Sequence, residues 1–162
     1  NIVKYLNILC LSDSMQKLKA LNSRELKDFY KKLDEQYGHI GKFDSIVLVS
    51  SKDKIYLLSR DYEKLDVDKL KVNNKGMYFG KFERDGLRLS IEGSQFIDAK
   101  KNVVELDADG MENWVMGKDV KIEHSTDYVI VKFKDDILGC GRVVNNVLRN
   151  MVPKERRLKE LT

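Results

Sequence analysis

Short apolar runs, separated by polar or glycine-containing turns, make up most of this sequence. Runs of this length are typical of β-strands, whereas a helix needs a longer periodic pattern. The run Ile46–Val49 is strand-sized, and no stretch approaches the ~20 apolar residues that span a bilayer. We therefore expect a chain of the α+β class, built from small sheets with few helices, and no association with a membrane.

The segment 22–38 departs from this pattern and predicts a helix. Asn22 is a preferred N-cap residue, and Glu25 stands at the third helical position, as in a variant of the capping box. Leu21 and Leu26 flank the cap as a hydrophobic staple. Gly38 ends the helix. Its apolar face is formed by Leu26, Phe29, Tyr30, Leu33 and Tyr37.

The rest of the N-terminal part alternates strand patterns with turns. The Asp-Gly pair in Arg84-Asp85-Gly86 is a strong signal for a tight hairpin turn between two strands. Short helices are expected at Asp61–Leu70 and near Ser94–Ala99. The segment Met15–Leu21 is expected to be a short strand or an entry segment, and the predicted strands after it are Phe43–Ser50, Lys54–Ser59, Gly76–Glu83 and Leu87–Ile91.

From Asn102 onward the pattern indicates a small closed β-barrel with one helix. Asp107 is the expected cap of that helix, and Gly117 ends it. The expected strands are Val103–Leu106, Val120–Glu123, Tyr128–Lys134, Ile137–Val144 and Leu148–Val152. We place a boundary near residues 99–102, which divides the chain into an extension (1–14), an α+β domain (15–99) and a barrel domain (100–162). With no flexible linker between them, the two domains are expected to pack together.

The basic residues are unevenly distributed. The formal net charge is +4, and residues 142–162 hold six basic and two acidic side chains, so the whole excess lies in this last segment. A concentrated basic end attracts polyanions better than the same charge spread over the surface. Pro153, the only proline, is expected to end the last strand and to present the basic side chains after it in a set direction. The alternative is a solvated basic C-terminus without function.

Other chemical sites are not indicated. Cys10 and Cys140 are too few for a disulfide framework and fit a reducing, cytoplasmic setting. His39 and His124 lack partners at ligand spacing, so we predict neither a metal site nor a cofactor. Gly139-Cys140-Gly141 lacks the ending of a phosphate-binding loop. Its glycines are expected to permit a bulge or a close approach of the backbone, to the barrel's own helix or to RNA, with Cys140 buried.

The segment Asn102–Leu158 resembles a PUA domain, the barrel found in pseudouridine synthases and archaeosine transglycosylases. The likeness rests on VVELDADGMENWVMGKDV, DYVIVKFKDDILGCGRV and NMVPKERRL. The preceding GMYFGKFERDGLRLSIEGSQFI resembles the domain before PUA in archaeal ribosome-biogenesis proteins. Those proteins are related to the PUA-like portion associated with Sun-family RNA cytosine methyltransferases. The resemblance covers about residues 16–160. It implies an N-terminal mixed α/β pre-PUA domain packed on a C-terminal PUA-like β-barrel.

The resemblance also implies where RNA binds. In PUA domains, the segment between the first helix and the second strand holds RNA together with the final strand. In this chain these are Gly117, Lys118 and Asp119, and the stretch Arg142–Arg157. The N-x-V-P-K-E-R-R ending differs from that of some PUA proteins and leaves the RNA target open. The candidate RNA-binding residues are Lys118, Lys121, Arg142, Arg149, Asn150, Lys154, Arg156 and Arg157.

The segment Arg88–Gln95 mixes polar and apolar residues more than a plain strand requires. Arg88 and Glu92 are expected to form an ion pair between the two domains, and Ser94 to cap the helix that follows. The functional alternative is that this segment lies beside the PUA surface and extends its contacts.

The expected function is RNA binding in rRNA or tRNA maturation or ribosome biogenesis, with RNA and a protein of an assembly or modification complex as partners. Catalysis is not expected. A methyltransferase of the Sun family needs a nucleotide-binding βα unit and a Pro-Cys segment, whereas Pro153 is followed by Lys154. Two alternatives stay open: the targeting partner of such an enzyme, and a protein-interaction adaptor without RNA.

Overall fold

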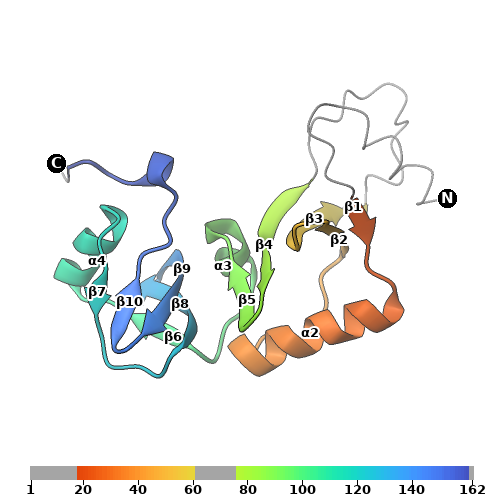
Figure 1. Ribbon diagram of the computed structural model, residues 1–162, viewed down its shortest axis with the longest axis horizontal. Helices are drawn as coiled ribbons and strands as arrows, with labels where there is room; N and C mark the ends of the chain where they lie inside the picture. Colours follow the sequence, from red (N-terminus) through yellow and green to blue (C-terminus); the bar gives the residue numbers. More distant parts are fainter. Residues whose placement is uncertain (1–17, 61–75, 161–162) are drawn as a thin grey trace.

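The structure is a computed structural model that describes residues 18–60 and 76–160. Two five-stranded sheets lie side by side along the long axis of the molecule, and α3 and β5 lie at their junction (Figure 1). The α+β class is as predicted. The expected extension at residues 1–14 and the expected helix Asp61–Leu70 lie outside the described residues. None of the described helices is long and apolar enough to cross a membrane.

The first sheet is an antiparallel meander with the order β1-β2-β3-β4-β5. Its strands are β1 (Leu18–Ala20), β2 (Ser45–Ser50), β3 (Lys54–Ser59), β4 (Met77–Glu83) and β5 (Gly86–Leu89). The predicted hairpin between β4 and β5 is confirmed, with Glu83 opposite Gly86. Short turns join β2 to β3 and β4 to β5, which brings these consecutive strands together.

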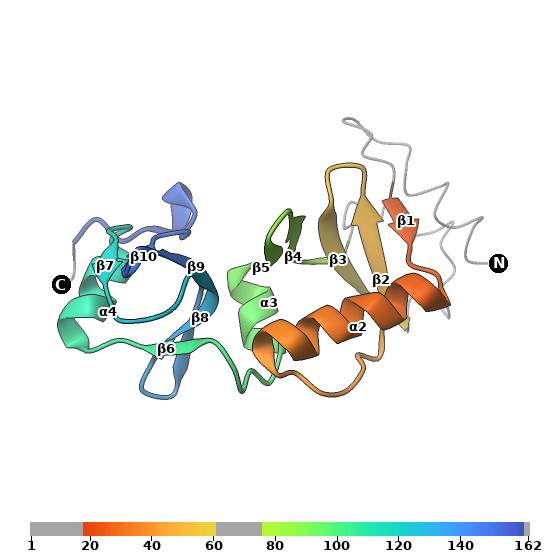
Figure 2. The same cartoon turned by 60° about the horizontal axis from the view of Figure 1, so that its bottom comes forward.

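Helix α2 (Ser23–Tyr37) covers one face of this sheet (Figure 2). The predicted capping box is confirmed: the Asn22 side chain accepts from the Glu25 amide at 3.0 Å, and the Glu25 carboxylate accepts from the Asn22 amide at 2.9 Å. Gly38 ends the helix in the left-handed conformation at φ 67°. Its buried residues, Phe29, Leu33 and Tyr37, pack on the sheet.

The second sheet has the order β6-β8-β9-β10-β7, with β6 parallel to β8 and the other pairs antiparallel. Its strands are β6 (Val103–Glu105), β7 (Val120–Lys121), β8 (Asp127–Phe133), β9 (Asp136–Val144) and β10 (Val147–Arg149). Helix α3 (Ile91–Phe96) follows β5 at the junction of the two sheets, and the helical elements of the second half are α4 (Ala108–Val115) and the 3-10 turn η3 (Lys154–Arg156).

The expected closed barrel is wrong in one respect, because the second sheet stays open between β6 and β7. Within the described residues no ladder joins these two edges. A hollow of about 480 Å³, lined by residues 103–107 and 120–124, lies between them. Strand β7 has only two residues and pairs with β10. Helix α4 covers the curled sheet instead. Its Trp114, which is 1% exposed, lies in the core of this half.

Both faces of the β8–β9 pair are buried. Val129 and Val131 face the core beneath α4, whereas Tyr128, Ile130 and Cys140 belong to the core that contains α2, β4 and β5. Strands buried on both sides read as continuous apolar runs, which explains the sequence of β8. The two sheets therefore pack directly on each other, as expected. The domain boundary near residues 99–102 stays a prediction.

Several predicted boundaries shift at the junction. Strand β5 ends at Leu89, and α3 begins at Ile91 because Ser90 is its N-cap, with Oγ accepting from the Gly93 amide at 2.8 Å. The expected cap at Ser94 is wrong, since its hydroxyl donates to the Ile91 carbonyl at 2.6 Å. A hydroxyl three residues before a free amide makes a better cap than one within the helix.

Candidate nucleic-acid interface

The loop after α4 and the segment after β10 lie against each other. The Asn150 side-chain amide donates to the carbonyls of Trp114 at 2.7 Å and Lys118 at 3.0 Å. The Asn150 backbone amide donates to the Asp119 carboxylate at 2.8 Å, and the Leu158 amide donates to the Val115 carbonyl at 2.9 Å. The structure thus brings together the two segments in which RNA contact was predicted. We call this surface, residues 117–121 and 149–159, the tail surface.

Asn150 connects the segment after β10 to the loop after α4 within this surface. It is half-buried, and besides its bonds to the loop after α4 its Oδ1 accepts from the Val152 amide at 3.0 Å. These bonds direct the chain away from β9, so β10 ends at Arg149. The expectations of a strand to Val152 and of Pro153 as its end are therefore wrong. Pro153 is the N-cap of η3, at φ −54°.

Three of the predicted arginines have carboxylate partners. Arg149 lies 2.8 Å from Asp119, and Arg156 lies 2.6 Å from Glu92 of α3. Arg142 pairs with Asp85 of the β4–β5 turn. The latter two pairs join the two sheets, so the expected ion pair between Arg88 and Glu92 is wrong. Arg88 lies 3.6 Å from Glu83 of the neighbouring strand instead.

Arg157 folds back onto the protein. Its Nε donates to the Val152 carbonyl at 2.9 Å, and its side chain lies against Gly117, which has φ 86°. Arg156 reaches across to α3, while Lys154 is exposed. The expectation that these three side chains share one direction is wrong, because each has different surroundings.

Four exposed lysines and the half-buried Arg157 are the cations of the tail surface without a carboxylate partner among the described residues. Lys118, Lys121 and Lys154 are exposed and form no ion pair with the described residues. Lys159, which belongs to the basic end but was not among the predicted site residues, is also exposed. Uncompensated cations attract phosphate more strongly than cations beside a carboxylate. The structure therefore shifts the emphasis from the arginines to the lysines.

Asp119 stays ionised beside these lysines. The hydrogen bond from the Asn150 backbone amide and that from Arg149 hold the pKa of the Asp119 carboxyl below its ordinary value. Its charge compensates that of Arg149. Asp119 was predicted to lie in the RNA-holding segment, and its two bonds give it a structural role there, since they hold the end of β10 against the loop after α4.

The Gly139-Cys140-Gly141 tripeptide lets β9 pack closely against its neighbours. A Cβ at position 141 would lie 2.7 Å from both the Trp114 Cη2 and the Leu148 Cδ1. Of the two expected alternatives, helix or RNA, the backbone at Gly141 therefore approaches helix α4. A register shift opposite Val131–Lys132 provides the expected bulge beside Gly139. Cys140 is 4% exposed, and burial raises the pKa of its thiol.

Comparison with known proteins finds a family model that is similar to the C-terminal part of the chain. Residues 101–158 match the family model described as Methyltransferase RsmF PUA domain. This match confirms the likeness to the PUA-like portion associated with RNA methyltransferases, and it covers residues 117–121 and 149–158 of the tail surface. The archaeal affinity and the pre-PUA nature of residues 15–99 stay predictions.

Individual relatives extend the likeness beyond the PUA part. The chain is 26% identical over 115 residues to a Ribosomal RNA small subunit methyltransferase F from Vibrio vulnificus, covering 69% of this chain and 24% of that protein. The Aeromonas hydrophila protein of the same name is 25% identical over 139 residues, 83% of this chain and 28% of the relative. That of Vibrio cholerae is 37% identical over 54 residues, 32% and 11% of the two chains. The chain thus spans about a quarter of the length of the Vibrio vulnificus and Aeromonas hydrophila relatives.

Proposed function

We propose that this chain binds RNA through the tail surface and that it acts in the modification of ribosomal RNA. The observation that carries the proposal is the convergence of residues 117–121 and 149–158 within the part that matches a PUA domain. Ribosomal RNA is favoured over tRNA because the relatives are named as methyltransferases of small-subunit ribosomal RNA.

The exposed lysines supply most of the affinity in this proposal. Each lysine that neutralises a phosphate releases condensed counterions, so binding weakens as salt rises. The arginines contribute less, since Arg149 and Arg156 would have to leave Asp119 and Glu92 to reach a phosphate. Exposed ion pairs contribute little stability, so this exchange remains open to a polyanion.

The role we assign to the chain is targeting rather than catalysis. The part that matches a family model carries the description of a PUA domain, and the one described cysteine, Cys140, is buried against Tyr37. A buried thiol with a raised pKa is a poor nucleophile. We propose that the chain holds the RNA and that catalytic residues outside the matched segment 101–158 carry out the methyl transfer.

The test is a binding measurement with a small-subunit rRNA fragment over a salt series. The Lys118→Ala/Lys154→Ala variant is compared with Lys27→Ala/Lys52→Ala, which removes one exposed lysine from α2 and one from the turn between β2 and β3. We expect the first variant to bind roughly tenfold more weakly near 0.1 M salt, with a salt slope shallower by ~1 to 2. The control is expected to bind like the wild type. Absence of RNA binding by the wild type, or equal losses in both variants, would falsify the proposal; the former result favours a protein-interaction adaptor.

A further inference from the structure

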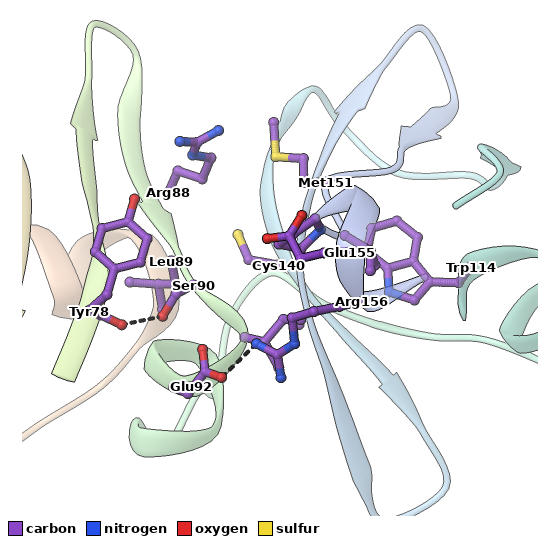
Figure 3. A pocket seen from close by; sticks show the side chains of 14 residues that line it. Tyr78, Arg88, Leu89, Ser90, Glu92, Trp114, Cys140, Met151, Glu155 and Arg156 are labelled. Carbon is purple, nitrogen blue, oxygen red and sulfur yellow. Dashed lines mark hydrogen bonds and ion pairs between the residues drawn. The ribbon is translucent and has the colours of Figure 1, made fainter. Parts of the chain in front are cut away.

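A cleft of about 380 Å³ lies at the junction of the two sheets, beside the tail surface (Figure 3). Tyr78, Arg88 and Glu92, from β4, β5 and α3, line one side of it, and Met151 and Glu155, from the segment after β10, line the other. Its volume falls in the range of about 300–1,000 Å³ that is usual for small-ligand sites. Because the two sides belong to different sheets, the site exists only when both halves are folded together.

The lining suits a flat, uncharged group better than a bare phosphate. Its charged side chains are two cations and two carboxylates, whose charges cancel: Arg88, Arg156, Glu92 and Glu155. The remaining contacts are largely apolar, from Leu89, Ile91, Trp114, Met151 and Val152. An apolar lining with a few polar groups orients a ligand through hydrogen bonds while its planar faces are removed from water.

Some polar groups of the cleft already have hydrogen-bond partners within the protein, and others do not. Arg156 donates to Glu92 at 2.6 Å, and the Ser90 hydroxyl donates to the Tyr78 carbonyl at 2.6 Å. The Glu155 carboxylate has no hydrogen bond or ion pair with residues 18–60 or 76–160, and it points into the cleft (Figure 3). Glu155 is thus the acceptor that is left for a ligand.

Trp114 also lines the cleft. Its indole N–H has no hydrogen-bond acceptor in the described part of the chain, but that nitrogen is enclosed by the protein and does not face the cleft. Of these two unsatisfied groups, Glu155 is therefore the one that a ligand in the cleft can reach.

We propose that this cleft accepts a single unstacked RNA base and that Glu155 reads an exocyclic amino group on it. The proposal rests on the proposed function and deepens it. Proteins recognise RNA sequence largely through unstacked bases, held on aromatic and arginine planes, which Tyr78 and Arg88 supply here. A carboxylate accepts from the amino group of cytosine, whereas uracil offers it no amino group. Lys154 and Glu155 are neighbours in η3, so RNA held at the tail surface reaches the mouth of the cleft.

The experiment compares the affinities of single-stranded oligocytidine and oligouridine of equal length. We expect the wild type to bind oligocytidine roughly fivefold more tightly or better, and Glu155→Ala to bring this ratio close to one. Loss of a negative charge raises the affinity for both oligonucleotides, so only the ratio tests the cleft. Glu160→Ala, which removes an exposed carboxylate from the same segment outside the cleft, is the matched control and keeps the wild-type ratio.

The outcomes separate this inference from the proposed function. Equal affinities of the wild type for the two oligonucleotides, or an unchanged ratio in Glu155→Ala, overturn the cleft proposal while RNA binding stands. The Lys118→Ala/Lys154→Ala variant is expected to weaken both oligonucleotides alike and to keep their ratio. If it binds both as the wild type does, the tail surface is not the RNA site and the proposed function fails.

Discussion

The side chain of Arg157 occupies the space that a Cβ at position 117 would take. A Cβ built on Gly117 would lie 2.5 Å from the Arg157 Nε and 2.9 Å from its Cζ, and Gly117 itself has φ 86°. The glycine therefore serves two purposes: it allows the left-handed turn after α4, and it lets the C-terminal segment lie flat on that turn.

We predict that Gly117→Ala lowers the free energy of unfolding by about 1–3 kcal/mol. Part of the loss is strain at positive φ, and part is the hydrogen bond from Arg157 to Val152, which is broken when the side chain is displaced. Gly41→Ala is the control, because Gly41 also has positive φ but open space around its Cβ. Urea denaturation measures both variants. A loss no greater than that of the control contradicts displacement of Arg157.

The pair between Arg142 and Asp85 joins the two sheets, and the Arg142 guanidinium also lies 5.4 Å from the centre of the Tyr128 ring. We predict a coupling of roughly 0.5–1 kcal/mol in a double-mutant cycle with Arg142→Ala and Asp85→Ala, modest because both side chains are partly exposed. The pair Lys31–Glu35 on α2, 3.6 Å apart and well exposed, is the reference and is expected to couple more weakly. Equal couplings in the two cycles argue against a role for Arg142 in holding the sheets together.

We predict that the stability of the protein depends on pH because of Asp119. Its pKa is lowered in the folded protein, chiefly by the Asn150 amide and then by Arg149, so its ionised form stabilises the fold. That contribution is complete above about pH 4, the ordinary pKa of an aspartate, and disappears as the pH falls through the lower folded value. Asp119→Asn keeps an acceptor for the amide and loses the charge. We expect the wild type to exceed this variant in unfolding free energy by up to about 1 kcal/mol at pH 7, and by less at lower pH. A difference that grows on acidification contradicts this assignment.

Cys140 is predicted to be unreactive while the protein is folded. Its thiol is buried and lies 3.6 Å from the Tyr37 hydroxyl, and burial raises its pKa. In a Cys10→Ser variant, an aromatic disulfide reagent is expected to modify Cys140 at least ~10³-fold more slowly than in urea-unfolded protein, since reaction requires opening of the core. Release of the coloured thiol measures the rate. Rapid modification under native conditions would show that the junction of the two sheets opens readily.

Local features were predictable because their causes lie within a few residues. The bounds of α2 follow from Asn22, Glu25 and Gly38, whose cap bonds span three to five residues. The β4–β5 hairpin likewise follows from one Asp-Gly turn. Where a cap choice depended on the partner strand, as at Ser90 and Ser94, the pattern alone selected the wrong residue, since Ser90 is fixed by the carbonyl of Tyr78 across the hairpin.

The candidate site was predictable as a list of cations and as two segments of chain, and the segments do meet. Which cations are free was not predictable. Arg142 and Arg156 are paired with carboxylates 57 and 64 residues away in sequence, so no local pattern shows that their charges are compensated. The cleft between Tyr78 and Met151 was missed for the same reason, because its sides come from different sheets.

The amino-acid sequence by itself determined the class of the chain, its main helix, most of its strands and the excess of basic residues at the C-terminal end, because backbone hydrogen bonding, side-chain periodicity and formal charge are local properties. Only the tertiary structure decided that the second sheet stays open between β6 and β7, that Arg142, Arg149 and Arg156 pair with carboxylates while the lysines of the tail surface do not, and that Glu155 faces a cleft. These outcomes depend on distances between residues far apart in the chain, which are set when the two sheets pack through Tyr128, Ile130 and Cys140.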